Sequence, residues 1–441
     1  MKRVSFYTLG CKLNQAESAT IAASFRQHGY EIVDFGQRAD ICFVNTCSVT
    51  ERAEQKSRQI VRRVIQTMPR AIVVVAGCYC QLHPEVFSQI PGVNLVLGTV
   101  NKFDVLNYLA EITKDSTPLQ LVKELPDSTP FCNPEVGYFT NHTRAFLKIQ
   151  EGCDMSCSYC SVPLSRGRSR SGLPEQLVRH AQKLVEQSFK EIVLTGVHIG
   201  AYGHDLHPRT NLVQLLKKLL AVPGLERIRL SSIDPNEISQ ELIELVAREN
   251  RICPHFHIPL QSGDDEILQR MNRSYRVARF RQVVNQITQR IPEVNIGTDV
   301  IVGFPGETDC HFENTYRLLE ELPIGYLHVF SFSPRPGTPA ASFTGQIDQS
   351  TKKKRSQELH RLNTQKKLAF ASKFIGGSLQ QVLVERNHSG NMAEGLSKNY
   401  LRVFIDGNYE FNQIVLVQIL QVGTDGIYGK VVKENSRVNA D

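Results

Sequence analysis

Strand and helix patterns alternate along two long stretches of this chain, and this alternation limits the folds that it can adopt. Between residue 1 and about residue 100, short apolar runs are separated by helical patterns, which predicts a parallel, doubly wound sheet. Six further apolar runs between residues 144 and 333 also alternate with helical patterns. With right-handed crossovers, these six units predict a partial (β/α)6 barrel whose chemistry lies at the carboxyl ends of its strands. We therefore predict an α/β protein.

The same patterns divide the chain of 441 residues, which is longer than a single core normally supports. Its last part has short alternating strands without helices, which is typical of a small, OB-like, five-stranded barrel. We predict an N-terminal domain at 1–115, a linker at 116–140, the partial barrel at 141–350, a basic connecting helix at 351–372 and the small barrel at 373–436. DSTP occurs twice around the linker, at 115–118 and at 127–130.

The sequence has neither a signal-peptide pattern at its start nor an apolar stretch near the roughly 20 residues of a membrane span. We therefore expect a cytoplasmic protein without a membrane partner. In a reducing compartment, its 11 cysteines indicate metal binding or catalysis rather than disulfide bonds.

Three cysteines form a C-x3-C-x2-C loop directly after the first strand of the second domain. This loop triad is Cys153, Cys157 and Cys160, in EGCDMSCSYC. Three thiolates on a 4Fe-4S cluster, which usually takes four, leave one iron open. That iron can chelate S-adenosylmethionine, so that one electron cleaves a carbon–sulfur bond and releases a radical. The alternative is a zinc site completed by Cys132 or a histidine, although zinc spacings typically contain two short pairs and no second pair follows here.

Three other cysteines, which we call the N-terminal triad, follow the ends of predicted parallel strands. They are Cys11, Cys47 and Cys78. Because adjacent parallel strands end at one edge of the sheet, we expect these three thiols to meet in one crevice. The alternative is that a cysteine is simply a small buried hydrophobe, and this is our interpretation of Cys42, Cys253 and Cys310.

Cys80 is a possible rival ligand because it is two residues from Cys78. Strand alternation would place both side chains on one side of the chain, but only Cys78 directly follows Gly77 at the strand end. We therefore prefer Cys78.

Several segments, in order and over nearly the full chain, resemble the methylthiotransferase family of radical-SAM enzymes. They are TLGCKLNQAES, FVNTCSVT, AGCYCQ, RAFLKIQEGCDMSCSYC, RGRSRS and IVGFPGET, and Tyr159 is the aromatic residue common before the last cysteine of the loop. The resemblance implies two 4Fe-4S clusters and S-adenosylmethionine as cofactors, with an auxiliary cluster on the N-terminal triad and a radical-SAM cluster on the loop triad. It also implies that both triads are catalytic and that the small barrel is a TRAM domain that binds the macromolecular substrate.

The sequence TLGCKLN, with Lys12 and Leu13, resembles that of the enzymes that act on N6-threonylcarbamoyladenosine at position 37 of tRNA. This implies the anticodon loop of tRNA and an electron donor such as flavodoxin or ferredoxin as partners. Two alternatives share the chemistry: action on isopentenyladenosine in tRNA, whose enzymes more often read YGCQMN, or on a ribosomal protein side chain. A non-enzymatic iron–sulfur or zinc RNA-binding protein is an alternative from another class.

The net charge of +7 is concentrated in two clusters on predicted helices. One holds Arg52, Lys56, Arg58, Arg62 and Arg63, and the other holds Lys352, Lys353, Lys354, Arg355, Arg361, Lys366 and Lys367. Each could be a solvated helix face. Together they favour RNA over protein as the substrate, because phosphate contacts dominate nucleic-acid affinity.

The candidates for binding S-adenosylmethionine follow the barrel strands, where glycines and hydroxyls suit a cofactor laid across the barrel mouth. They are Thr195, Gly196, Ser231, Ser232, Gln261 and the turn from Gly303 to Glu307, with Tyr159 beside the cluster. Any of them could instead serve a turn or a helix cap.

For other residues near the loop triad, two roles remain open. Arg166, Arg168 and Arg170 could meet a cofactor carboxylate or an RNA phosphate. His198 stands where the family commonly has Asn, and could contact substrate or be a structural histidine. Ser161 and Leu164 also depart from the family pattern, which usually has an apolar residue and Tyr at these positions.

Overall fold

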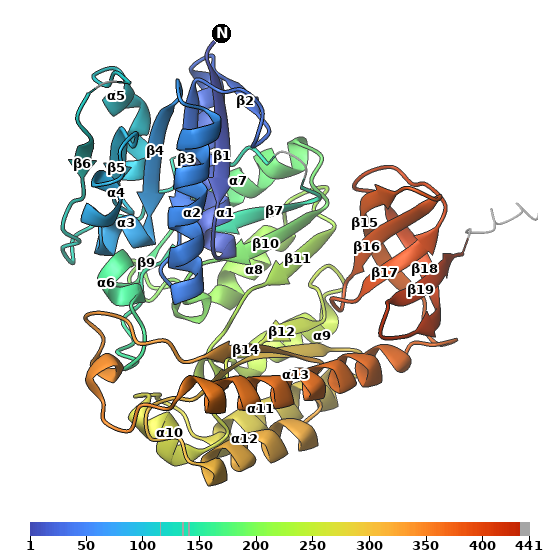
Figure 1. Cartoon of the computed structure of the whole chain (residues 1–441). Coiled ribbons are helices and arrows are strands. Elements are labelled where there is room, and N and C mark those ends of the chain that lie inside the picture. The colour runs from blue at the N-terminus through green and yellow to red at the C-terminus, as the bar shows by residue number, and fades with distance from the viewer. Residues whose placement is uncertain (115, 135, 140–141, 433–441) are drawn as a thin grey trace, which may run out of the picture.

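The computed structural model describes residues 1–114, 116–134, 136–139 and 142–432. Figure 1 shows an N-terminal domain, a partial barrel below it and a small barrel to one side. The end of the small barrel that we predicted at 436 lies outside the described residues, as do positions 135 and 140 of the predicted linker.

The N-terminal domain is a parallel sheet with helices on both faces. Its strands are β1 (Arg3–Thr8), β2 (Glu31–Val33), β3 (Ile41–Thr46), β4 (Ile72–Gly77), β5 (Leu95–Leu97) and β6 (Leu119–Leu121), in the order β2-β1-β3-β4-β5-β6. The helices α1 (Lys12–Gln27) and α5 (Val105–Leu109) cover one apolar face of the sheet, and α2 (Glu51–Thr67) covers the other. The predicted doubly wound sheet is confirmed. The patterns did not single out β2 or β6, and β6 lies in the segment that we predicted as linker.

The strand order reverses between β1 and β3, because β2 lies on the outer side of β1 and β4 follows β3. In open α/β sheets, ligands bind outside the carboxyl ends of the strands at such a switch point. The segments after β1, β3 and β4 therefore share one edge.

The central domain contains the six predicted barrel strands. They are β7 (Arg144–Lys148), β10 (Glu191–Thr195), β11 (Arg227–Leu230), β12 (His255–His257), β13 (Asn295–Val302) and β14 (Tyr326–Ser331). Two parallel sheets, β7-β10-β11 and β12-β13-β14, are joined by a bridge between Ser232 and His257. Leu194 and Ile192 belong to the apolar core shared with the helices, whereas the alternate residue Glu191 faces inward and pairs with Arg229.

The outer helices of the barrel are α7 (Pro174–Glu186), α8 (Leu212–Leu220), α9 (Gln240–Arg248), α11 (Val277–Arg290) and α12 (Asp309–Glu321). Short elements at the mouth are β8 (Gln150–Glu151), α6 (Val162–Arg166), β9 (Arg170–Ser171) and α10 (Asp265–Arg270). Among the described helices, none combines the length and the apolar composition needed to cross a membrane.

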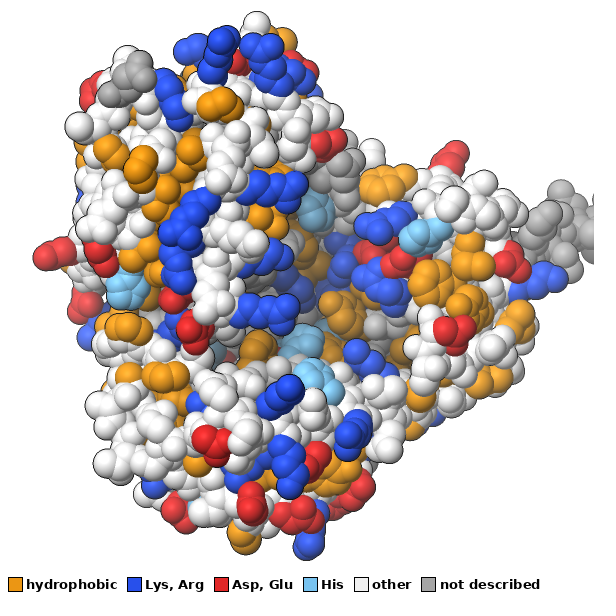
Figure 2. All heavy atoms as spheres, in the orientation of Figure 1, with side chains coloured by type: hydrophobic (Ala, Val, Ile, Leu, Met, Phe, Trp, Pro, Cys, Tyr) orange, Lys and Arg blue, Asp and Glu red, His pale blue; other side chains and the backbone are white. Residues whose placement is uncertain are grey.

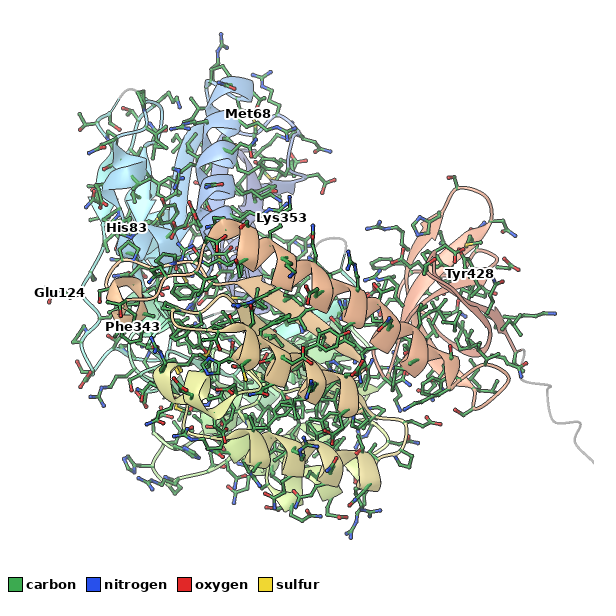
Figure 3. All side chains as sticks on the ribbon, turned by 60° about the horizontal axis from the view of Figure 1, so that its bottom comes forward. Met68, His83, Glu124, Phe343, Lys353 and Tyr428 are labelled. Carbon is green, nitrogen blue, oxygen red and sulfur yellow. The ribbon has the colours of Figure 1, made fainter. Side chains whose placement is uncertain are left out.

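The basic segment forms α13 (Gln349–Ser372), which runs along the barrel towards the small barrel (Figure 1). Its basic side chains do not all face solvent. Lys352 is 3% exposed and Arg355 is 5% exposed, and Arg355 pairs with Asp309 at 2.7 Å. Lys353, labelled in Figure 3, is exposed, as are Lys354, Arg361 and Lys367, and on α2 the exposed residues are Arg52, Lys56, Arg62 and Arg63.

The C-terminal module is a closed barrel, as predicted. Its strands are β15 (Gln380–His388), β16 (Met392–Ser397), β17 (Arg402–Asp406), β18 (Ile414–Val422) and β19 (Ile427–Val431), in the order β15-β16-β17-β19-β18. The sequence patterns named only four of these strands and missed β16.

The small barrel is fixed to the partial barrel by two buried arginines of β11. Arg227 and Arg229 donate hydrogen bonds to main-chain carbonyls of Gln381, Leu396, Ser397 and Lys398 at 2.8 to 3.3 Å. Glu191 lies 2.6 Å from Arg229 and 3.5 Å from Arg227, and balances part of their charge. These four hydrogen bonds are therefore all made to backbone of the small barrel.

Candidate active site

The N-terminal triad lies at one edge of the parallel sheet. Cys11 follows β1, Cys47 follows β3 and Cys78 follows β4, and these three strands are neighbours. Burial raises the pKa of Cys47 to about 12, and the nearby thiols of Cys11 and Cys78 add to this rise. Cys11 is exposed, whereas Cys47 and Cys78 are buried.

Two glycines allow the strand ends of this triad to approach. Gly10 has φ +95°, and a Cβ atom there would lie 2.7 Å from the Sγ of Cys47. Gly77 has φ +106°, and a Cβ atom there would lie 2.7 Å from the carbonyl oxygen of Thr46. Only glycine adopts such φ values without strain, so both positions are required by the local geometry.

Cys80 points away from the N-terminal triad because Cys78 and Cys80 both belong to the short helix α3 (Cys78–Leu82). Residues two apart do not share a helix face, so the strand alternation assumed from the sequence was wrong here. Cys80 is fully buried, and its Sγ lies 3.6 Å from Oγ1 of Thr46.

The remaining cysteines are placed less uniformly than predicted. Cys42 and Cys253 are buried, as expected. Cys310 is exposed, so its interpretation as a buried hydrophobe was wrong. It lies in the first turn of α12, at the surface of the barrel.

The loop triad follows β8, at the mouth of the barrel. The loop is held by hydrogen bonds from the Cys153 amide to the Gly167 carbonyl and from the Cys160 amide to the Cys157 carbonyl, each 3.1 Å long. Ser158 donates through its amide and its hydroxyl to the carbonyls of Met271 and Arg270. The end of α10 therefore fixes the position of this loop.

Two cationic side chains contact the thiols of the loop triad. Arg273 donates to the Sγ of Cys157 at 3.0 Å and to Asp234 at 2.6 Å. His198 lies with Nδ1 3.8 Å from the Sγ of Cys153 and Nε2 2.8 Å from Glu237. Burial acts to lower the pKa of His198, but hydrogen bonds to Cys153 and Glu237 raise it to about 10. The sequence offered no signal for Arg273, because its partners are distant along the chain.

Neither triad brings its three thiols as close together as a single zinc ion requires. Among the described residues, the one group of three or more His, Cys, Asp or Glu ligand atoms that all lie within 4.8 Å of one another is His257, Asp299 and His328. Zinc would gather four ligands at about 2.3 Å around one ion. The thiolates of a 4Fe-4S cluster bind different iron atoms and stand farther apart, so a separation above 4.8 Å is compatible with a cluster.

The predicted S-adenosylmethionine contacts lie at the same end of the barrel as the loop triad. Thr195 ends β10 with Gly196 after it, and Ser231 follows β11. The Ser231 hydroxyl is buried and has no hydrogen-bond partner among the described residues, so it is available to bind a ligand. Ser232 forms the bridge to His257.

The other predicted contacts differ in how well they suit a cofactor. Gln261 has φ +67°, a strained conformation that is typical of functional sites. A Cβ atom on Gly303 would clash with Lys352 of α13, and Glu307 accepts from the Gly303 amide, so this turn is tied to α13. Tyr159 packs against an apolar cluster that contains Phe304 and Phe332.

Arg166 has a structural role that its sequence position did not reveal. It is buried, and its guanidinium lies 2.8 Å from Glu17 and 2.7 Å from the side-chain oxygen of Asn14, both on α1. Glu17 also binds Lys102 at 2.5 Å and Lys148 at 3.1 Å. These contacts join the N-terminal domain to the barrel.

Arg170 and Arg168 differ in burial and in their partners. Arg170 is buried and lies 3.0 Å from Glu151, which also binds Lys148 at 2.6 Å. Arg168 is exposed and pairs with Asp127 at 2.9 Å. The structure therefore places Arg166 and Arg170 inside a buried charge network, which we define as Glu17, Lys102, Lys148, Glu151, Arg166 and Arg170.

The helix α6 connects the two triads. It begins two residues after Cys160 and ends at Arg166, which contacts α1 near Cys11. The carbonyl of Ser165 in α6 also accepts from Thr99 of the N-terminal domain at 2.9 Å. α6 further contacts α3, which begins at Cys78. The two sets of thiols thus lie on either side of one short helix.

A hollow opens where the N-terminal domain, the partial barrel and the small barrel meet (Figure 2). Lysine and arginine side chains gather on its walls, with histidines beside them. Where the two barrels meet, the buried ring of His255 stacks on Tyr400 of the small barrel with ring centroids 4.5 Å apart. Asp299 lies 2.9 Å from His257 and 3.2 Å from the exposed ring of His328. The sequence analysis missed all five residues.

Two family models match this chain. Residues 147–319 match the radical SAM superfamily, and residues 3–98 match a family described as uncharacterized protein family UPF0004. The first range covers most of the barrel, without β14, and the loop triad, and the second covers the N-terminal triad.

Two curated relatives match over nearly the full length. The chain is 39% identical over 442 residues to threonylcarbamoyladenosine tRNA methylthiotransferase MtaB of Bacillus subtilis (strain 168), covering 98% of each chain. It is 33% identical over 438 residues to tRNA-2-methylthio-N(6)-dimethylallyladenosine synthase of Clostridium botulinum (strain Langeland / NCTC 10281 / Type F), covering 96% of each.

Among solved structures, the chain is similar to the radical S-adenosylmethionine methyltransferase TsrM from Kitasatospora setae. The TM-score is 0.55, and the match covers 77% of this chain and 75% of that one. At 14% identity, this likeness concerns the fold.

Proposed function

Because this chain belongs to the family of radical-SAM tRNA methylthiotransferases, we propose that it converts N6-threonylcarbamoyladenosine at position 37 of tRNA to its 2-methylthio derivative. The observation that carries the proposal is the 39% identity to a threonylcarbamoyladenosine tRNA methylthiotransferase over 98% of both chains. Three further relatives of the same description, from Aquifex aeolicus, Thermotoga maritima and Rickettsia prowazekii, are 35% to 37% identical over 95% or more of this chain.

The two triads support this reaction because it needs two different iron sites. When bound, the cluster on Cys153, Cys157 and Cys160 would supply the electron that cleaves S-adenosylmethionine, and the cluster on Cys11, Cys47 and Cys78 would supply the site of sulfur transfer. The short helix α6 between the triads keeps the two tasks close to one substrate.

The residues around the loop triad have supporting roles in this proposal. Arg273 and His198 hold Cys157 and Cys153 and offset negative charge on their sulfurs. Thr195, Gly196, Ser231, Ser232 and Gln261 line the end of the barrel where S-adenosylmethionine would lie. Gly303 would act less directly, because Lys352 fills the space beside it.

The tRNA would enter the hollow between the three domains (Figure 2). The exposed basic residues of α2 and α13 and the small barrel, which we assign as a TRAM domain, would contact its phosphates. A small redox protein such as flavodoxin or ferredoxin would deliver the electron.

Two experiments test the proposal. Anaerobic reconstitution should give about eight irons per chain and form 5′-deoxyadenosine, whereas one zinc and no product would refute the enzyme assignment. For the substrate, tRNA from cells lacking and then regaining the gene is digested and analysed by mass spectrometry. The methylthio form of threonylcarbamoyladenosine should disappear and return. If the methylthio form of isopentenyladenosine changes instead, the substrate assignment is wrong.

A further inference from the structure

Lys12 connects the N-terminal triad with the small barrel. It directly follows Cys11 and is the first residue of α1, so its backbone lies beside the proposed site of sulfur transfer. Its side chain reaches the small barrel, where its ammonium lies 5.9 Å from the centroid of the Tyr400 ring. The ammonium makes no hydrogen bond or ion pair with any residue that the structure describes.

The groups around Lys12 leave an excess of positive charge. The guanidinium groups of Arg144 and Arg229 and the carboxylate of Glu191 are close enough to interact with its charge. Glu191 already lies 2.6 Å from Arg229, and Arg144 pairs with Glu385 at 2.8 Å. An anion that binds beside Lys12 would offset this excess of positive charge.

Tyr400 forms a fixed wall beside this ammonium. It has φ +68°, a conformation that non-glycine residues seldom adopt and that persists where the surrounding structure holds it. Its ring stacks on His255 and lies 5.2 Å from the guanidinium carbon of Arg229. The site therefore combines a flat aromatic wall with an unpaired ammonium, which suits a ligand that carries one carboxylate on a planar polar group.

We propose that Lys12 is a specificity-determining residue that binds the carboxylate of the threonylcarbamoyl group. This inference rests on the proposed function. The threonylcarbamoyl group ends in a carboxylate, whereas an isopentenyl group is neutral. The position beside Cys11 is where the modified base must come for sulfur transfer, so the ammonium is placed for the base substituent rather than for the RNA backbone. A charge-assisted hydrogen bond there selects the ionised substrate.

The test compares two anticodon stem-loop RNAs of identical sequence with the reconstituted full-length enzyme. One carries N6-threonylcarbamoyladenosine, and the other carries the neutral carboxamide of the same group. The wild type should prefer the acid. Lys12→Gln should lose about tenfold or more in kcat/KM on the acid, mainly through KM, as expected for loss of a hydrogen bond to a charged group, and should change little on the amide. Lys12→Arg should keep the preference.

Controls separate recognition from structure. Lys217→Gln removes a lysine charge on the exposed face of α8 and should leave both substrates unaffected. Iron content and 5′-deoxyadenosine formation without RNA should match the wild type in Lys12→Gln. An equal loss on both RNAs, or an unchanged preference for the acid, would overturn the inference while leaving the proposed function intact. A wild type that methylthiolates neither RNA would overturn the proposed function itself.

Discussion

Substitution of Glu17 by Gln tests whether the buried charge network holds the N-terminal domain on the barrel. Glu17 is completely buried on α1, and its carboxylate binds Lys102 at 2.5 Å, Lys148 at 3.1 Å and Arg166 at 2.8 Å. Lys148 and Arg166 belong to the barrel domain, so this one carboxylate bridges two domains. Glutamine preserves the shape of the side chain and removes only its charge.

The expected cost follows from leaving three buried cations without this partner. Removal of one member of a buried ion pair costs about 3–5 kcal/mol, because the remaining charge is neither solvated nor paired. Glu151 still pairs with Lys148, whereas Lys102 has Glu17 as its one ion-pair partner in the described part of the chain. We therefore expect the free energy of unfolding to fall by about 3–5 kcal/mol.

The assay is urea unfolding of the full chain followed by circular dichroism, with Glu31→Gln as the control. Glu31 pairs with Arg3 at 3.4 Å on the surface, and such a pair contributes about 0–1 kcal/mol. Although burial opposes ionisation, Arg166, Lys102 and Lys148 hold the pKa of Glu17 well below its ordinary value of 4.5. Its contribution is therefore present above that pH and is lost as the pH falls below it. Glu17→Gln should lose less stability on acidification than the wild type.

Two results would contradict this account. One is a Glu17→Gln midpoint no lower than that of Glu31→Gln. The other is an acid dependence equal to that of the wild type.

Three further changes test other parts of the structure. Cys78→Ala should lower the iron content of the reconstituted protein by about half, whereas Cys80→Ala should leave it unchanged, and equal losses would contradict the choice of Cys78. Gly77→Ala should destabilise the protein by about 1–3 kcal/mol in thermal unfolding, because alanine is strained at φ +106° and its Cβ would meet Asn45; an unaltered transition would argue against this constraint. Lys353→Gln should weaken tRNA binding and reduce its salt dependence in filter binding, and an unchanged salt slope would exclude a phosphate contact there.

The placement of the N-terminal triad could be predicted because it depends on a general property of parallel sheets. The ends of neighbouring parallel strands share one edge of the sheet, independently of the loop conformations. Correct strand assignments were therefore enough to place Cys11, Cys47 and Cys78 at the same edge. The preference for Cys78 over Cys80 stays a prediction, but the reasoning from strand alternation was wrong. The chain turns into α3 directly after Gly77, and helical geometry then separates the two side chains.

The partners of the charged residues could not be predicted. Arg166 binds Glu17, which is 149 positions away in the sequence, and no local pattern encodes such a contact. The burial of basic residues on α13 could not be predicted either. Lys352 and Arg355 lie in the same basic run as exposed lysines and arginines, but these two side chains are buried. From the sequence, Lys12 was recognised only as part of a motif. Its contact with the Tyr400 ring could be found only in the structure.

The contact between the two barrels has a consequence for how such an enzyme can diverge. Arg227 and Arg229 hold the small barrel by its main-chain carbonyl groups, which every amino-acid sequence of that fold presents. Side chains at these four positions can therefore be exchanged without losing these hydrogen bonds. Glu385 and Tyr400 are different, because their side chains contact Arg144 and His255 of the partial barrel. We therefore expect the surface of the small barrel away from this junction to diverge more freely than these two positions.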